Sequence, residues 1–403
     1  MQLAPTEAGF AAGRLEQITE HLTRNYIEPR KIAGCQTLVA RHGHIAYASS
    51  LGFMDLEREK PMQDDAIFRI YSMSKPITSV ALMSLYEQGH FQLNDPVSRF
   101  IPEWRDQKVY VSGEFESMET RVPSQPMTMR HVLSHSGGLT YGSTAHPVDR
   151  AYRHAGVRRD QAETLKTFVE KLAEVPLRYE PGTQWLYSFS TDVCGYLVEA
   201  ISGKPFDQYL QETIFAPLGM VDTSFSVAPD KVSRFSANYQ RGPDKSLKMI
   251  DDPQASSYLN KPAFLSGGGG LTSTMADYHR FCEMLRRGGE YNGARILGPR
   301  TIELMTKNHL SGGGDLAKLA IGAFSETAYE GVGFGLGFAM TLDEVAAGSL
   351  GAGDYYWGGA ASTIFWVDPK EDLVAIFMTQ LMPSATFNFR GQLKNIIYSS
   401  IVS

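Results

Sequence analysis

Ser72 and Lys75, a serine and a lysine three residues apart, are the strongest candidates for covalent chemistry in this sequence. Segment 74–88 carries apolar residues around most of its circumference, which predicts a buried helix that begins at this pair and ends at Gly89. Residues three apart share a helix face, so the amine can reach the hydroxyl. Burial disfavours a charged lysine and lowers its pKa, which makes the amine a better base. The pattern predicts a serine nucleophile activated by a lysine.

Ser74 is the competing candidate for the nucleophile. It is adjacent to Lys75 in the sequence, so it points to a different face of the predicted helix. A serine and a lysine at this spacing should occur about once by chance in a chain of this length. The position of Lys75 at the start of an apolar helix is what favours Ser72 as the nucleophile.

Several segments, in a fixed order, accompany this pair: 68–76 (FRIYSMSKP), 93–97 (LNDPV), 131–139 (HVLSHSGGL), 217–220 (PLGM), 222–225 (DTSF) and 268–271 (GGGL). Together they resemble the serine β-lactamase and penicillin-recognising superfamily. The resemblance covers nearly the whole chain and is greatest to the class C-like branch, in particular to the family VIII carboxylesterases. It implies an active site between a sheet domain and a helical domain.

The resemblance also implies partners for the serine. Tyr187-Ser188-Phe189 corresponds to the family's Y-x-N element, so Tyr187 is expected to act as general base toward Ser72, and Ser188 to contribute to substrate binding. Lys75 is then expected to hold both groups and to favour the phenolate, because a nearby ammonium lowers the pKa of a phenol. Phe189 replaces the amide that the family uses at this position.

Trp357-Gly358-Gly359 corresponds to the K-T-G element of the lactamases, in the form seen in the esterase branch. The resemblance implies that Gly358 and Gly359 let the strand approach the substrate closely, and that the N–H groups of Ala360 and Ser72 form the oxyanion hole. A lysine at position 357 would pair with a substrate carboxylate, and a tryptophan cannot. This wall of the site therefore favours an uncharged acyl group.

Strand patterns occur near both ends of the chain and helical patterns in between. Segments 36–40 and 44–49 predict a hairpin around Arg41-His42-Gly43, while 362–367 and 373–379 predict two strands before a last helix at about 386–401. The predicted fold class is α+β, an antiparallel sheet flanked by N- and C-terminal helices with an inserted, mostly helical domain. The expected domains are 1–70 with 265–403, and 71–264.

Composition excludes several other classes of function. The chain has 403 residues, 38 Lys and Arg against 44 Asp and Glu, and a formal net charge of −6, which gives no electrostatic reason to bind nucleic acid. No apolar run is long enough for a membrane span, and no signal peptide is visible, so a soluble cytoplasmic protein is expected. His131 and His135 lack a third ligand and are interpreted as supporting a loop. No metal or organic cofactor is expected, and the oligomeric state is not readable.

These observations predict a serine hydrolase that cleaves carboxylic esters of small to medium acyl groups through an acyl-enzyme. A β-lactamase, a D-aminopeptidase or an acyltransferase would use the same residues on another substrate. A non-catalytic binding protein is a further alternative, although all three elements keep chemically competent residues. Acyl and alcohol preferences depend on loops such as 103–128 and 311–330, whose shapes the sequence does not reveal.

Overall fold

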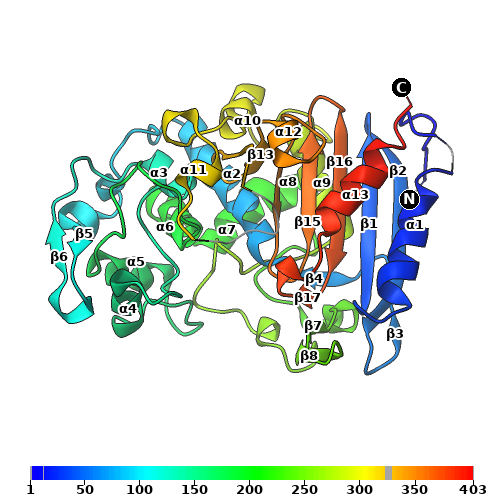
Figure 1. Cartoon of the computed structure of the whole chain (residues 1–403), viewed down its shortest axis with the longest axis horizontal. Coiled ribbons are helices and arrows are strands. Elements are labelled where there is room, and N and C mark those ends of the chain that lie inside the picture. Colours follow the sequence, from blue (N-terminus) through cyan, green and yellow to red (C-terminus); the bar gives the residue numbers. More distant parts are fainter. Residues whose placement is uncertain (1, 12, 323–328, 403) are drawn as a thin grey trace.

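An eight-stranded antiparallel sheet forms one side of the molecule (Figure 1). The computed structural model describes residues 2–11, 13–322 and 329–402. The strand order is β12-β13-β14-β15-β16-β1-β2-β3, so strands from the two ends of the sequence meet where β16 pairs with β1. The strands are β1 (Gly34–Arg41), β2 (His44–Asp55), β3 (Lys60–Pro61), β12 (Val332–Phe334), β13 (Ala339–Thr341), β14 (Tyr355–Gly358), β15 (Ile364–Asp368) and β16 (Leu373–Thr379). This arrangement confirms the predicted fold class.

Helices cover both faces of the sheet. Along β16, alternate residues enter two different cores, because successive side chains of a strand point to opposite faces. Leu373, Ala375 and Phe377 pack with α1 (Glu16–Leu22) and α13 (Phe389–Tyr398). The intervening Val374 and Ile376 pack on the side of α9 (Met275–Arg286). Burial on both faces explains why β1, β15 and β16 consist almost entirely of buried residues.

The hairpin between β1 and β2 turns at the predicted residues. His42 and Gly43 have φ values of 55° and 78°, and a two-residue turn that follows the twist of the strands requires positive φ at both of its central positions. The predicted last helix is shorter than expected. α13 begins after Asn388, whose side chain accepts a hydrogen bond from the Gly391 amide, and ends at Tyr398.

The other side of the molecule is mostly helical (Figure 1). Its centre is α2 (Ser74–Glu87), which is buried over nearly its whole length and packs against α6 (Ser190–Ser202). Pro76 lies in the first turn of α2, where a missing N–H costs nothing. In the described chain as a whole, the remaining helices are α3 (Met129–Leu133), α4 (Pro147–His154), α5 (Leu165–Ala173), α7 (Phe206–Leu210), α8 (Ala216–Leu218), α10 (Pro299–Met305), α11 (Leu316–Leu319) and α12 (Glu344–Ala347), of which α12 lies over the sheet (Figure 1).

Four small strands lie in the middle of the chain, between the strand patterns near its two ends. β5 (Val109–Ser112) pairs with β6 (Glu119–Arg121), and β7 (Asn238–Arg241) pairs with β8 (Leu247–Asp251). Their side chains are largely exposed or half-buried, so they lack the apolar alternation that reveals a strand in sequence. The other small strands are β4 (Ile67–Arg69) with β9 (Thr272–Thr274), β10 (Glu290–Tyr291) with β11 (Ala294–Arg295), and β17 (Leu381–Met382), which pairs with β7.

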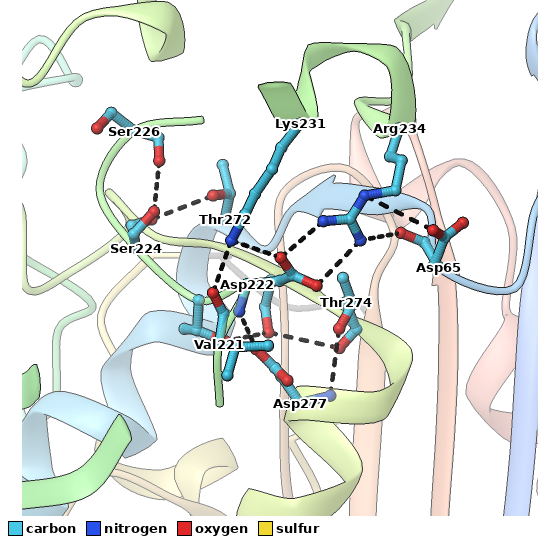
Figure 2. A network of polar contacts seen from close by, with 12 residues as sticks. Asp65, Val221, Asp222, Ser224, Ser226, Lys231, Arg234, Thr272, Thr274 and Asp277 are labelled. Carbon is cyan, nitrogen blue, oxygen red and sulfur yellow. Dashed lines mark hydrogen bonds and ion pairs between the residues drawn. The ribbon is translucent and has the colours of Figure 1, made fainter. Parts of the chain in front are cut away.

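Motif 222–225 forms part of a polar network at the start of α9 (Figure 2). The carboxylate of Asp222 accepts hydrogen bonds from Arg234 at 2.7 and 3.0 Å and forms an ion pair with Lys231 at 2.8 Å. Its amide donates to Asp277 at 2.7 Å, and the Asp277 amide in turn donates to the helix-capping hydroxyl of Thr274. The network therefore ties the segment after α8 to the N-terminus of α9.

We expect Asp222→Asn to lower the free energy of unfolding by roughly 1–3 kcal/mol at pH 7, because asparagine loses the charge that both cations face. Arg234 and Lys231 hold the pKa of Asp222 below its usual value. The stabilisation should therefore be fully present above the unfolded pKa of about 3.9 and be lost as the pH falls through the lower folded pKa. Chemical denaturation of both proteins across this range measures the difference. Asp65→Asn is the control, since its side chain is 61% exposed and lies 3.6 Å from Arg234; an equal effect there would contradict the interpretation.

None of the helices in the described part of the chain has the length and apolar character needed to cross a membrane.

Candidate active site

Ser72 and Lys75 lie together where the chain enters α2. Ser72 is in the short 3-10 turn Tyr71–Met73, and the Lys75 amine lies 3.1 Å from the Ser72 Oγ and 2.6 Å from the carbonyl oxygen of Gly268. The hydroxyl of Ser74 is turned away and accepts a hydrogen bond from the amide of Leu271 at 3.1 Å. Of the two serines, Ser72 is therefore the one in contact with the lysine.

The residue before the candidate nucleophile has a strained backbone. Tyr71 has a φ of 41°, in the left-handed region that a side chain with a Cβ rarely adopts, at a cost of roughly 1–3 kcal/mol. Its hydroxyl accepts a hydrogen bond from the side chain of Asn238 at 3.0 Å, which helps to hold it in place. Strain of this kind persists where the surrounding structure fixes the backbone, here in the turn that orients Ser72.

Tyr187 completes the cluster from a distant part of the sequence. Its phenol is hydrogen-bonded to the side chain of Ser72, and it accepts a hydrogen bond from the Trp357 indole nitrogen at 3.2 Å. The Lys75 nitrogen lies 4.5 Å from the centre of the Tyr187 ring. The hydroxyl, the amine and the phenol thus meet as the sequence motifs imply.

Burial sets the protonation of this cluster. It lowers the pKa of Lys75 well below its usual value, and the charge of Arg159 lowers it further. Burial also raises the pKa of Tyr187 well above its usual value, and Tyr141 adds to that shift. The neutral amine and the neutral phenol are therefore favoured. This direction agrees with the expected base character of Lys75 and runs against the expected phenolate at Tyr187, because desolvation disfavours the charged form of both groups.

The Trp357-Gly358-Gly359 segment lies against the nucleophile turn. Gly358 ends β14 opposite Ile364, and the Gly359 amide donates to the Thr363 carbonyl at 2.7 Å. A Cβ at position 359 would lie 2.5 Å from the carbonyl oxygen of Ile70, two residues before Ser72. Only glycine allows this approach. It brings the chain that carries Ala360 next to the serine, and in the described part of the protein the Ala360 amide has no hydrogen-bond acceptor.

Ser188 is not brought into this cluster. Its side chain is buried, 3.2 Å from a ring nitrogen of His135 and 2.8 Å from the hydroxyl of Ser190. His135 also contacts Thr191, and His131 accepts a hydrogen bond from the Thr128 amide at the start of α3. Ser188 therefore supports the loop below Tyr187 and does not face a substrate, while the two histidines have the loop-supporting position expected of them.

Asp192 and Arg159, which belong to none of the sequence motifs, lie close enough to Lys75 for their charges to shift its pKa. The buried carboxylate of Asp192 accepts hydrogen bonds from the Gly268 amide at 3.0 Å and the Ser266 hydroxyl at 2.5 Å. Its other oxygen lies 2.9 Å from Arg159. The Gly268 carbonyl in turn binds the Lys75 amine. Asp192 therefore fixes the loop at Ser266 and Gly268 that positions this amine. A buried aspartate in the first turn of a mostly buried helix, α6, has only its place beside the apolar residues Val193 and Leu197 as a signal in the sequence.

Tyr141 is a third residue that the sequence did not single out. Its phenol is hydrogen-bonded to Tyr187 and to Arg159, and burial raises its pKa to about 12. The Tyr141 and Tyr187 rings lie 5.4 Å apart. Tyr141 therefore connects the catalytic cluster to Arg159.

A sheet between helical layers with a serine-lysine-tyrosine cluster defines a serine hydrolase of the β-lactamase fold. The family model described as Beta-lactamase matches residues 19–396, and the chain belongs to this family.

Similar proteins include an esterase and a hydrolase with promiscuous acyltransferase activity. Protein Rv1367c of Mycobacterium tuberculosis is 31% identical over 87% of this chain and 86% of its own length, and the esterase EstB of Burkholderia gladioli is 29% identical over 93% and 91%. The structure of EstCE1, described as a hydrolase with promiscuous acyltransferase activity, has a TM-score of 0.79 and 28% identity over 96% of this chain and 98% of its own. A mutant of simvastatin synthase from Aspergillus terreus has a TM-score of 0.80 and 25% identity over 96% and 98%.

Proposed function

We propose that this protein is a carboxylesterase that cleaves esters of small to medium acyl groups through an acyl-enzyme on Ser72. The observation that carries the proposal is the contact of the Ser72 hydroxyl with both the Lys75 amine and the Tyr187 phenol. The esterase EstB among the relatives supports the choice of an ester as the substrate.

Acylation follows from the protonation that burial favours. As the Ser72 Oγ attacks the ester carbonyl, its proton passes to the neutral Lys75 amine, 3.1 Å away. The N–H groups of Ser72 and Ala360 stabilise the oxyanion that forms. When the tetrahedral intermediate collapses, the bond to the alcohol oxygen breaks, Tyr187 donates its proton to that oxygen, and the Lys75 ammonium returns a proton to Tyr187. One proton has then moved from Ser72 to the alcohol.

Deacylation reverses these transfers with water in place of the alcohol. Tyr187 and Lys75 take a proton from water as its oxygen attacks the acyl carbon, and they return a proton to Ser72 as the acid leaves. An alcohol in the position of the water would give acyl transfer instead. The promiscuous acyltransferase activity described for EstCE1 makes transfer the second candidate function.

Two experiments test the proposal. The first is covalent labelling with a fluorophosphonate probe, and the second is turnover of 4-nitrophenyl esters of increasing acyl length by the unlabelled enzyme. We expect one probe molecule per chain, located on Ser72 by peptide mass analysis, and turnover of the esters. The cephalosporin nitrocefin should acylate Ser72 more slowly than the preferred ester does. Faster turnover of nitrocefin would identify a lactamase, and absence of any covalent adduct would contradict a catalytic serine.

A further inference from the structure

A pocket of about 230 Å³ adjoins the catalytic cluster. Its lining includes Tyr71, which precedes Ser72 in the chain, and Gly269, which follows the glycine that binds Lys75. The aromatic rings of Phe225, Tyr258 and Phe264 form much of the remaining wall. The pocket therefore has room for a short substituent of a substrate and begins at the residues that flank the reacting groups.

Arg159 brings a positive charge to this pocket. Its side chain is 37% exposed, while that of its ion-pair partner Asp192 is fully buried. Asp192 contacts the Nε and one terminal nitrogen of the guanidinium, at 3.2 and 2.9 Å. A guanidinium has five N–H donors, so this pairing and the bond to Tyr141 leave donors for a further acceptor.

The lining of the pocket contains no acidic residue among those that the structure describes. Asp192 lies behind Arg159, and both of its oxygens already accept hydrogen bonds from the protein. An anion in the pocket would therefore meet a guanidinium beside aromatic rings, with no carboxylate on the wall to repel it. Arginine pairs with a carboxylate through geometrically matched, charge-assisted hydrogen bonds.

We propose that this pocket binds a carboxylate carried by the ester substrate, and that Arg159 recognises it. Position 357 corresponds to the lysine of the lactamase K-T-G element, which would pair with such a carboxylate, but here it is a tryptophan. Arg159 offers a positive charge from a different wall of the site. The expectation of an uncharged acyl group, which rested on Trp357 alone, is revised accordingly. The inference rests on the proposed esterase function and narrows its substrate class.

Matched pairs of esters test the proposal, one pair for each side of the ester bond. 4-Nitrophenyl hydrogen adipate is compared with 4-nitrophenyl hexanoate, and 4-acetoxybenzoate with 4-acetoxybenzamide. We expect kcat/KM to be at least about tenfold higher for the anionic member of one pair, since a hydrogen bond to a charged group has this order of effect. Arg159→Gln should lower that ratio about tenfold, mainly through a higher KM for the anionic ester, and Arg159→Lys should restore part of it.

The ratio of kcat/KM between the anionic and the neutral ester of a pair distinguishes carboxylate recognition by Arg159 from a purely structural role of this residue. Arg159 also pairs with Asp192, so Arg159→Gln can slow every ester, but a purely structural role would slow both members of a pair equally. Arg158→Gln is the matched control, because its side chain is 74% exposed and does not line the pocket; its ratios should equal those of the wild type. Equal kcat/KM for the two members of both pairs would overturn the inference, and so would an equal loss of kcat/KM for both members in Arg159→Gln. Turnover of the neutral esters would still support the esterase function in either case.

Discussion

Ser72→Ala is expected to lose about 10⁴-fold or more in kcat on chromogenic esters, because among the residues that the structure describes Ser72 carries the hydroxyl that contacts the Lys75 amine. Ser72 is half-buried and its hydroxyl contributes little to packing, so the unfolding temperature should change by only a few degrees. Stopped-flow release of 4-nitrophenol measures both the acylation burst and steady-state turnover. Neither should remain in the variant.

Ser74→Ala is the matched control for this variant. It removes the acceptor of the Leu271 amide and should therefore lower stability, yet it should keep the burst and the covalent label on Ser72. A burst that persisted in Ser72→Ala and disappeared in Ser74→Ala would reverse the assignment of the nucleophile.

Lys75→Met is expected to lower kcat by about 10²–10⁴-fold, the usual contribution of a positioned acid or base. In the wild type, the pH profile of kcat/KM should rise with pH through the lowered pKa of Lys75, because only the deprotonated amine accepts the serine proton. The variant should lose this limb. An unchanged acidic limb in Lys75→Met would show that another group accepts the proton.

The same substitution should leave stability equal or higher at pH 7. The folded pKa of Lys75 is below its unfolded pKa of about 10.4, so burying the lysine has a cost that is absent above pH 10.4 and grows as the pH falls. Methionine has no charge to desolvate. A variant that is inactive and at least as stable as the wild type, by thermal unfolding, would identify a residue retained for chemistry, whereas a large loss of stability would assign Lys75 a structural role.

The sequence predicted the catalytic cluster because its members occupy short motifs with a physical signature. A lysine in an apolar helix, as at Lys75, is conspicuous whatever the tertiary structure. The strands β1, β2 and β16 were equally predictable, since they consist of apolar and β-branched residues between clear turns. The small strands β7 and β8 were not, because β7 is rich in polar residues, β8 is only partly buried, and β7 also pairs with the distant β17.

The roles that depend on burial could not be predicted. The protonation of Tyr187 depends on how completely Tyr141, Trp357 and Lys75 remove it from water, which no local pattern reveals. Ser188 follows Tyr187 directly and yet points into the core toward His135. Arg159 lay in a short basic stretch, and its function depends on the distant Asp192 that orients it.

The seam of the sheet, where β16 pairs with β1, has a consequence for folding during synthesis. The Thr379 hydroxyl donates to the carbonyl of Gly34, 345 residues earlier, and β14 and β15 join the sheet only on the far side of that seam. Contacts between such distant residues slow folding, because a long loop must close before they form. During synthesis, β1 and β2 must therefore wait as a hairpin with an unpaired edge until β16 has left the ribosome. The segment that carries Ala360, which lies between β14 and β15, is thus among the later parts to form, and the active site can be complete only after β16 has been made.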